Sequence, residues 1–194
     1  LKRQYRMHPS ISSFANAEFY NFQLVDDPEA NREGLTLPSD FNSRLSVVEV
    51  TGPHGRKSVT PEGDAVQDFE TSLCNPSEAL VVKGYVQWLM RFNVDPSEIA
   101  VVTPYRAQAA LIKEVLAEVV MESGSPTIGT VHLLQGEERQ YVILSLVRSF
   151  AEADTEVFDP VPQNMRRKVY NLGFLNDRRL ANVALTRAQL GLVV

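Results

Sequence analysis

Two short runs near opposite ends of the sequence each carry an arginine in a context suited to binding a phosphate. They are QYRMHP, which contains Arg6, and NVALTRA, which contains Arg187. A guanidinium is always charged and holds its N–H donors in a fixed plane, so it matches phosphate oxygens more closely than an ammonium does. Arg6 and Arg187 are therefore candidates for stabilising the negative charge on a transferring phosphoryl group.

The loop that usually cradles the phosphates next to such arginines is not found in this sequence. No Gly-x-x-x-x-Gly-Lys-Ser/Thr pattern occurs between Leu1 and Val194. The run GPHGRKS at 52–58 has a similar composition, but its glycines are too closely spaced, and Arg56 precedes the lysine where a glycine is required. We therefore expect the chain to supply only one part of a nucleotide site.

Further polar groups stand where predicted strands end. Thr103, Tyr105 and Gln108 belong to TPYRAQ, at the junction of a strand and a helix, and Thr130 opens TVHLLQG at the end of another strand. We expect these groups and Arg187 to face the same edge of a sheet. The alternative for the Thr-Pro-Tyr run is structural, because proline ends a strand and the tyrosine can be half-buried.

The composition is that of one globular domain spanning 1–194. Hydrophobic residues make up 44% of the 194 residues, which is enough for a substantial core. A net charge of −5 argues against a broad basic surface, so any contact with a polyanion must be local. The single cysteine, Cys74, excludes an internal disulfide, and no apolar run approaches the ~20 residues needed to cross a bilayer. We expect an intracellular protein, nuclear or cytoplasmic. It should lack a zinc site, because no histidine or cysteine has ligand spacing near His132.

Hydrophobic periodicity and turn signals predict strands that alternate with helices along most of the chain. Such alternation favours an α/β fold with a mostly parallel sheet flanked by helices, with ligands at the carboxyl ends of the strands. The predicted helices are 10–20, 76–92, 108–121 and 177–188, and the predicted strands are 46–51, 99–103, 127–131, 141–147 and 190–194. Irregular insertions are expected near 21–45, 52–72 and 149–170.

Six motifs in a fixed order make the chain similar to a known family. They are QYRMHP at Gln4, Asn75 with the Glu78-Ala79 pair, TPYRAQ at Thr103, TVHLLQGEE leading into YVILSLVRS, GFLND at Gly173, and NVALTRA at Asn182. The chain resembles the second RecA-like domain of superfamily 1 helicases of the up-frameshift type, the group that includes the nonsense-mediated decay helicase and senataxin. The resemblance implies a RecA-like P-loop NTPase fold without its own phosphate loop.

The resemblance also implies roles for individual residues. Tyr5 would stack on adenine, Arg6 would reach the terminal phosphate, and Arg187 would be the arginine finger. The remaining implied contacts are with the nucleotide and its ribose, through Gly136 and Glu138, and with the nucleic-acid backbone, through Thr103 and Thr130 and, more weakly, Tyr105 and Gln108. No metal-binding residue is expected in this chain.

The function implied by the resemblance is that of an ATP-dependent helicase or translocase moving 5′-to-3′ on single-stranded RNA or DNA. ATP with Mg²⁺ would be bound mainly by an upstream RecA-like domain of the same protein, so this chain alone should be inactive. The alternative is a catalytically inactive RecA-like scaffold in a ribonucleoprotein or signalling complex. The sequence departs from the family at His132, where an aspartate is usual, and at Glu137, where a basic residue is usual. The arginine pair Arg178 and Arg179 is displaced by one position, so no role is assigned to it.

Overall fold

A five-stranded parallel sheet forms the centre of the computed structural model, which describes residues 2–34, 37, 44–50, 55–59, 70–117, 119, 124–134, 136–147 and 177–194. The strand order is β3-β9-β8-β6-β7, and every neighbouring pair is parallel. The strands are β3 (Leu45–Ser46), β6 (Ile99–Thr103), β7 (Thr127–Thr130), β8 (Arg139–Leu144) and β9 (Ala188–Val193). The predicted α/β fold with a mostly parallel sheet is confirmed.

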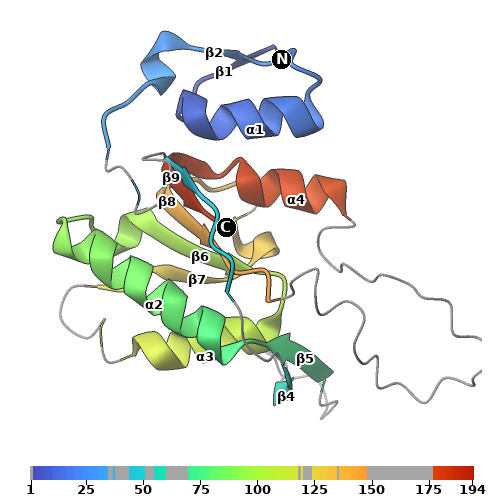
Figure 1. Ribbon diagram of the computed structural model, residues 1–194, viewed down its shortest axis with the longest axis vertical. Coiled ribbons are helices and arrows are strands. Elements are labelled where there is room, and N and C mark those ends of the chain that lie inside the picture. The colour runs from blue at the N-terminus through green and yellow to red at the C-terminus, as the bar shows by residue number, and fades with distance from the viewer. Residues whose placement is uncertain are drawn as a thin grey trace, which may run out of the picture.

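Helices cover both faces of this sheet, as Figure 1 shows. On one face lie α4 (Arg178–Leu185) and, above it, α1 (Pro9–Phe19), with a core that includes Ile11, Val142 and Leu192. On the other face lie α2 (Pro76–Arg91) and α3 (Arg106–Leu116), with a separate core that includes Leu89 and Ile112. Because β6 is buried over its whole length, its sequence is a run of apolar residues ending in threonine.

The helix starts follow the capping rules. The Asn75 side chain accepts a hydrogen bond from the backbone N–H of Glu78 at 3.1 Å, and Pro76 takes the first position of α2. Asp177 caps α4 in the same way, accepting bonds from the N–H groups of Arg179 and Leu180 at 3.0 and 3.1 Å. The helices predicted from residue 10, from residue 76 and from residue 177 are confirmed to within one residue at their starts.

Short elements complete the fold. They are β1 (Arg3–Gln4), β2 (Val25–Asp26), the antiparallel pair β4 (Gly55–Val59) and β5 (Glu70–Cys74), and the 3₁₀ turns η1 (Pro28–Ala30), η2 (Pro96–Glu98) and η3 (Val131–Leu134). The irregular structure predicted for 52–72 is wrong where these residues are described. An antiparallel ribbon pairs 55–59 with 70–74, and the N–H of Ala107 donates to the Ser72 hydroxyl at 3.2 Å, which ties the ribbon to the start of α3.

Several predicted boundaries shift. The strand predicted at 46–51 is a regular strand only at Leu45 and Ser46. One further bond, from the N–H of Val48 to the Val194 carbonyl at 2.8 Å, follows, and Val47 is 76% exposed. The strand predicted at 141–147 begins at Arg139 and ends at Leu144. Val147 adopts φ +71°, a left-handed conformation that cannot continue a strand. α3 begins two residues before the prediction and ends at Leu116. The insertion predicted near 149–170 lies outside the described residues.

The described residues contain neither a candidate membrane span nor a candidate metal cluster. No helix among them combines the length and apolar character needed to span a bilayer. Within the same residues, no group of three or more His, Cys, Asp and Glu side chains is arranged to hold a metal ion.

Candidate functional site

The QYRMHP run forms a tight turn held by the side chain of its first residue. The buried Gln4 amide oxygen accepts the backbone N–H groups of Arg6 and Met7 at 2.9 and 2.8 Å. Its amide nitrogen donates to the Met7 carbonyl at 2.8 Å and to Asp26 Oδ1, on β2, at 2.7 Å. Both polar atoms of the Gln4 side chain are used in this way, and the bonds to Arg6 and Met7 fix the backbone of the turn. Tyr5, which is 56% exposed, and the Arg6 side chain are thereby directed outward.

Arg6 lies against residues from the far end of the sequence. Its Nε donates to the Glu138 carboxylate, just before β8, and its Nη1 donates to the Thr186 carbonyl at 3.3 Å. The other Glu138 oxygen accepts a hydrogen bond from Gln189 Nε2, on β9, at 2.7 Å. The hydrogen bond from Arg6 is the largest cause that lowers the pKa of Glu138. Glu138 is therefore an ionised carboxylate at neutral pH, held from two sides.

Arg187 occupies the turn between α4 and β9, directly after Thr186. Its Nη1 donates to the Glu137 carbonyl at 3.3 Å, and its Nε is buried without a partner among the described residues. Burial lowers the pKa of Arg187, the charge of Arg6 lowers it further, and Glu138 opposes both effects. An arginine nevertheless keeps its charge at neutral pH. We call Arg6, Arg187 and Glu138 the arginine cluster. Its surplus positive charge and unpaired donor fit an anion such as a phosphate.

Gly136 shapes the approach to this cluster. It has φ +89°, a conformation that residues with a Cβ rarely adopt, and it lies in the turn between η3 and β8. The two residues that follow are Glu137 and Glu138, whose carbonyl and carboxylate oxygens hold the two arginines. Gly136 thus lies next to the arginine cluster in the sequence, and its backbone turn precedes the two glutamates that contact the arginines.

The candidates from the sequence lie at two edges of the sheet. Thr103 and Thr130 are register partners at the carboxyl ends of β6 and β7. Arg187 precedes β9, and its carbonyl accepts the N–H of Arg139, at the start of β8, at 3.2 Å. The expectation that all of them share one edge is wrong. In a parallel sheet, a helix-to-strand turn lies at the opposite edge from a strand-to-helix turn.

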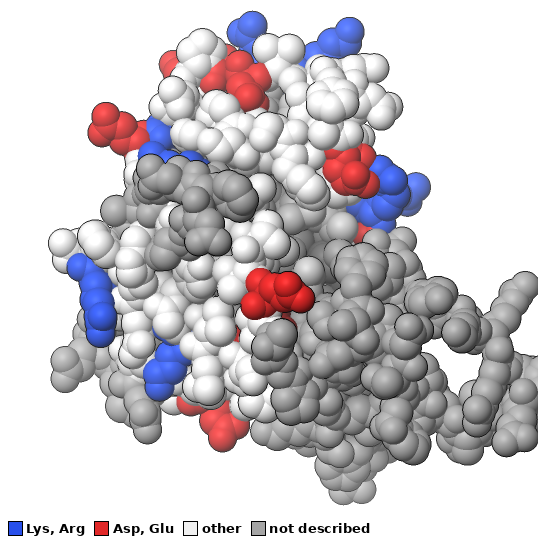
Figure 2. Space-filling model, in the orientation of Figure 1, with Lys and Arg blue, Asp and Glu red and all other residues white. Residues whose placement is uncertain are grey.

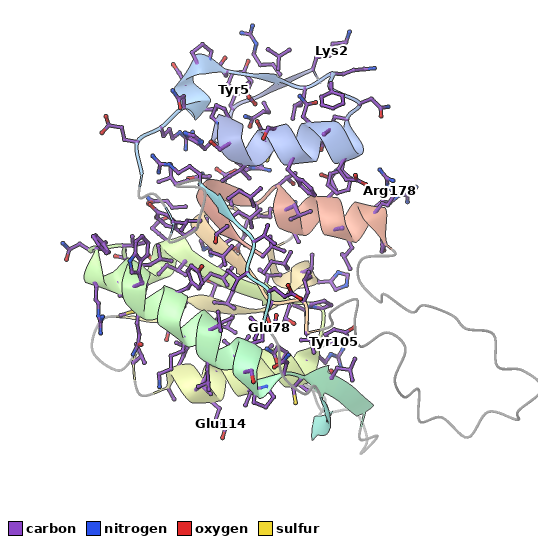
Figure 3. The ribbon with its side chains drawn as sticks, in the orientation of Figure 1. Lys2, Tyr5, Glu78, Tyr105, Glu114 and Arg178 are labelled. Carbon is purple, nitrogen blue, oxygen red and sulfur yellow. The ribbon has the colours of Figure 1, made fainter. Side chains whose placement is uncertain are left out.

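At the carboxyl edge, two of the four nucleic-acid candidates line a pocket of about 290 Å³. The lining residues are Pro104, Tyr105, Thr130, Val131, His132, Asp177 and Leu180. Figure 3 shows Tyr105 well separated from Tyr5, which lies in the layer of β1. Thr103 and Gln108 are fully buried, so the structure does not support the direct contact predicted for them. The Thr103 hydroxyl instead accepts the N–H of Tyr105 at 3.3 Å.

Comparison with known proteins shows the family to which the chain belongs. The family described as AAA domain matches residues 1–194. The chain belongs to this family, in the group of superfamily 1 helicases of the up-frameshift type. It is 37% identical over its whole length to mouse "3'-5' exoribonuclease HELZ2" and 33% identical to an Arabidopsis thaliana "Regulator of nonsense transcripts 1 homolog". A third relative, also 33% identical over the whole chain, is the Schizosaccharomyces pombe "DNA polymerase alpha-associated DNA helicase A". The chain spans only 6%, 14% and 27% of these relatives.

Sequence reasoning missed three residues of this helicase-family domain that the structure brings to the two sites. Gln4 shapes the turn at Tyr5 and Arg6, Gln189 orients Glu138, and His132 lines the carboxyl-edge pocket. Gln4 is the first residue of QYRMHP, and Gln189 directly follows NVALTRA. These positions could have identified both residues as neighbours of the site. His132 was noted as a departure from the family and rejected as a zinc ligand, so no contact with nucleic acid was predicted for it.

A buried polar network supports the carboxyl edge of the helicase-family domain. Gln108 Oε1 accepts the N–H of Asn75 at 2.8 Å, and its Nε2 donates to the Ser145 hydroxyl at 3.0 Å. Glu78 accepts the N–H of Val147 with both carboxylate oxygens, at 2.9 and 3.2 Å. The starts of α2 and α3 are thereby tied to the chain that leaves β8. Burial raises the pKa of Glu78 above its ordinary value of 4.5, although hydrogen bonds from Ser145 and Val147 oppose the shift.

We expect the Glu78→Gln variant to lose less stability than the wild type as the pH rises. A raised pKa in the folded state means that the folded protein binds more protons than the unfolded one. Its stabilising contribution is complete below pH 4.5 and is lost as the pH rises through the folded value. Between pH 4 and pH 7, the unfolding free energy of the wild type should therefore fall relative to that of the variant. Urea denaturation across this range measures the difference, with the exposed Glu49→Gln as control. Parallel curves for wild type and Glu78→Gln would contradict the assignment.

Proposed function

We propose that residues 1–194 act as the second motor domain of an ATP-dependent helicase or translocase. Arg6 and Arg187 reach the terminal phosphate of an ATP molecule held, with its Mg²⁺, mainly by an upstream RecA-like domain of the same protein. Tyr5 stacks on the adenine, and Gly136 and Glu138 lie beside the ribose. The observation that carries the proposal is the convergence of Arg6 and Arg187 around one carboxylate from opposite ends of the sequence.

The chemistry of the arginine cluster explains why ATP hydrolysis should depend on closure of the two domains. The transition state of phosphoryl transfer places negative charge on the γ-phosphate oxygens, and a guanidinium that reaches them stabilises that charge. Both arginines are already oriented by protein oxygens, since Arg6 contacts Thr186 and Glu138 while Arg187 contacts Glu137. When the phosphate leaves, the attraction that closes the cleft weakens, which couples turnover to domain movement.

Single-stranded RNA or DNA is proposed to bind at the carboxyl edge, through Tyr105 and Thr130 of the pocket there. An aromatic ring and a hydroxyl can contact a base and a phosphate without a dense set of cations. Figure 2 shows Lys and Arg side chains scattered among Asp and Glu over the described part of one face, with no continuous basic area. This charge distribution supports a local contact.

The test compares the full-length protein with the isolated 1–194 chain in a phosphate-release assay, with and without single-stranded RNA or DNA. We expect ATP hydrolysis by the full-length protein that nucleic acid stimulates, and no hydrolysis by the isolated chain. A full-length protein that binds nucleic acid but never hydrolyses ATP would favour the scaffold alternative. Hydrolysis by the isolated chain would contradict the dependence on a second domain.

A further inference from the structure

Arg32 is a surface residue whose guanidinium contacts the turn that contains Tyr5 and Arg6. It follows η1, and its Nη2 donates to the backbone carbonyl of Tyr5 at 3.2 Å while its Nε donates to the carbonyl of Glu29 at 3.4 Å. Both acceptors are uncharged carbonyls, so the bonds orient the guanidinium without neutralising it. The remaining N–H groups of this exposed side chain have no partner among the described residues.

The charge of Arg32 also acts on the arginine cluster. Arg6 donates directly to Glu138, Glu138 acts on Arg187, and Arg32 contributes to holding the pKa of Glu138 below its usual range. Glu138 thus contacts Arg6 and lies within electrostatic reach of Arg187 and Arg32. The neighbouring acid, Glu137, is engaged in an ion pair with Arg139 at 2.7 Å. Among these groups, three guanidinium charges face the single carboxylate of Glu138, an excess that suits a ligand with several negative charges.

We propose that Arg32 is a third nucleotide-binding arginine, which binds the phosphates of ATP nearest the sugar. This inference rests on the proposed function of the arginine cluster. Arg6 and Arg187 lie together and take the terminal phosphate, whereas Arg32 is attached to the backbone of Tyr5, the residue proposed to stack on the base. The α- and β-phosphates connect these two ends of the nucleotide. The planar fork of Arg32 matches their oxygens in the way that makes arginine a preferred phosphate ligand.

A purely structural role for Arg32 makes a different prediction. If the side chain only held the Tyr5 backbone in place, its loss would weaken stacking on the base, and every adenine-containing ligand would be affected alike. If it binds phosphate, ligands that carry phosphates are weakened and adenosine is not.

The experiment measures ADP and adenosine binding, and the steady-state kinetics of ATP hydrolysis, in full-length wild-type, Arg32→Gln and Arg32→Lys proteins. For Arg32→Gln we expect the Kd for ADP and the KM for ATP to rise about two- to fivefold, the upper part of the range for one exposed charged contact. We expect kcat to change less than about twofold and the Kd for adenosine to stay the same. Arg32→Lys should recover part of the ADP affinity, because lysine keeps the charge but not the planar fork. The control is Arg91→Gln, at the exposed end of α2, which should alter none of these values.

Unchanged ADP affinity in Arg32→Gln would overturn the inference, and so would an equal loss of adenosine and ADP binding. ADP binding needs no turnover, so the two proposals fail separately. A wild-type protein that hydrolyses no ATP but loses ADP affinity in Arg32→Gln would overturn the motor proposal and retain Arg32 as a phosphate ligand. If the wild type is active and Arg32→Gln is unaffected, the motor proposal is retained and the role of Arg32 is overturned.

Discussion

Replacing Arg187 with alanine in the full-length protein is expected to lower nucleic-acid-stimulated ATP hydrolysis by a factor of about 10³ to 10⁵, the range found for arginine fingers. The guanidinium stabilises charge that develops only in the transition state, so ATP binding should remain largely intact. Arg187→Lys should not restore the rate, because a lysine ammonium cannot reproduce a planar fork that also bonds the Glu137 carbonyl. Phosphate release at saturating nucleic acid measures the rate, and titration with a fluorescent ATP analogue measures binding.

Arg178→Ala is a suitable control for this loss. Arg178 belongs to the same C-terminal region, but its side chain pairs with Glu18 on α1 at 3.2 Å and lies over the Phe19 ring. The Arg178→Ala variant should hydrolyse ATP at close to the wild-type rate. Wild-type turnover by Arg187→Ala itself would refute the proposed role of the finger.

The second large effect is expected for Arg6→Ala, which should reduce kcat by about 10² to 10³, the usual cost of removing one preorganised donor to a developing charge. The same substitution leaves Glu138 without its main partner, and this carboxylate then repels the incoming phosphates. The KM for ATP should therefore rise as well. In Arg6→Ala/Glu138→Gln the repulsion is removed, so part of the KM increase should be reversed while kcat remains low. A double-mutant cycle on kcat and KM measures both effects.

Arg3→Ala provides the matched control, since Arg3 lies on β1, three residues before Arg6, but pairs with Asp27 at 3.5 Å. Its kinetic constants should remain near the wild-type values. Additive effects of Arg6→Ala and Glu138→Gln would show that the ion pair between them does not influence nucleotide binding.

The parts of the fold that could be predicted are those in which local sequence and burial agree. β6 was predicted to the residue because all five of its positions are buried between two helical layers, which demands an uninterrupted apolar run. α2 was predicted because Asn75, Pro76 and Glu78 form a complete start signal. In both cases one short segment contains all the information.

The parts that failed depend on partners distant in the sequence. The ribbon of β4 and β5 exists because 55–59 pairs with 70–74, and neither segment carries a strong strand pattern alone. Gln108 was expected to face outward because it follows a strand end, and the resemblance implied a contact with nucleic acid, whereas the structure satisfies its amide between Asn75 and Ser145. Arg187 was placed at the wrong edge because its position after a helix was not combined with the direction of the strands.

The separation of the arginine cluster from the carboxyl-edge pocket has a mechanical consequence under the proposed function. Five residues of β6 extend over roughly 17 Å, and helices on both faces make such a sheet a stiff plate. Under the proposed function, a small tilt of the sheet at the arginine cluster would therefore move the carboxyl-edge pocket, where the nucleic acid is proposed to bind, sideways. If the proposed function holds, the length of β6 and β8 sets how far the nucleic-acid end moves for a given tilt at the nucleotide end.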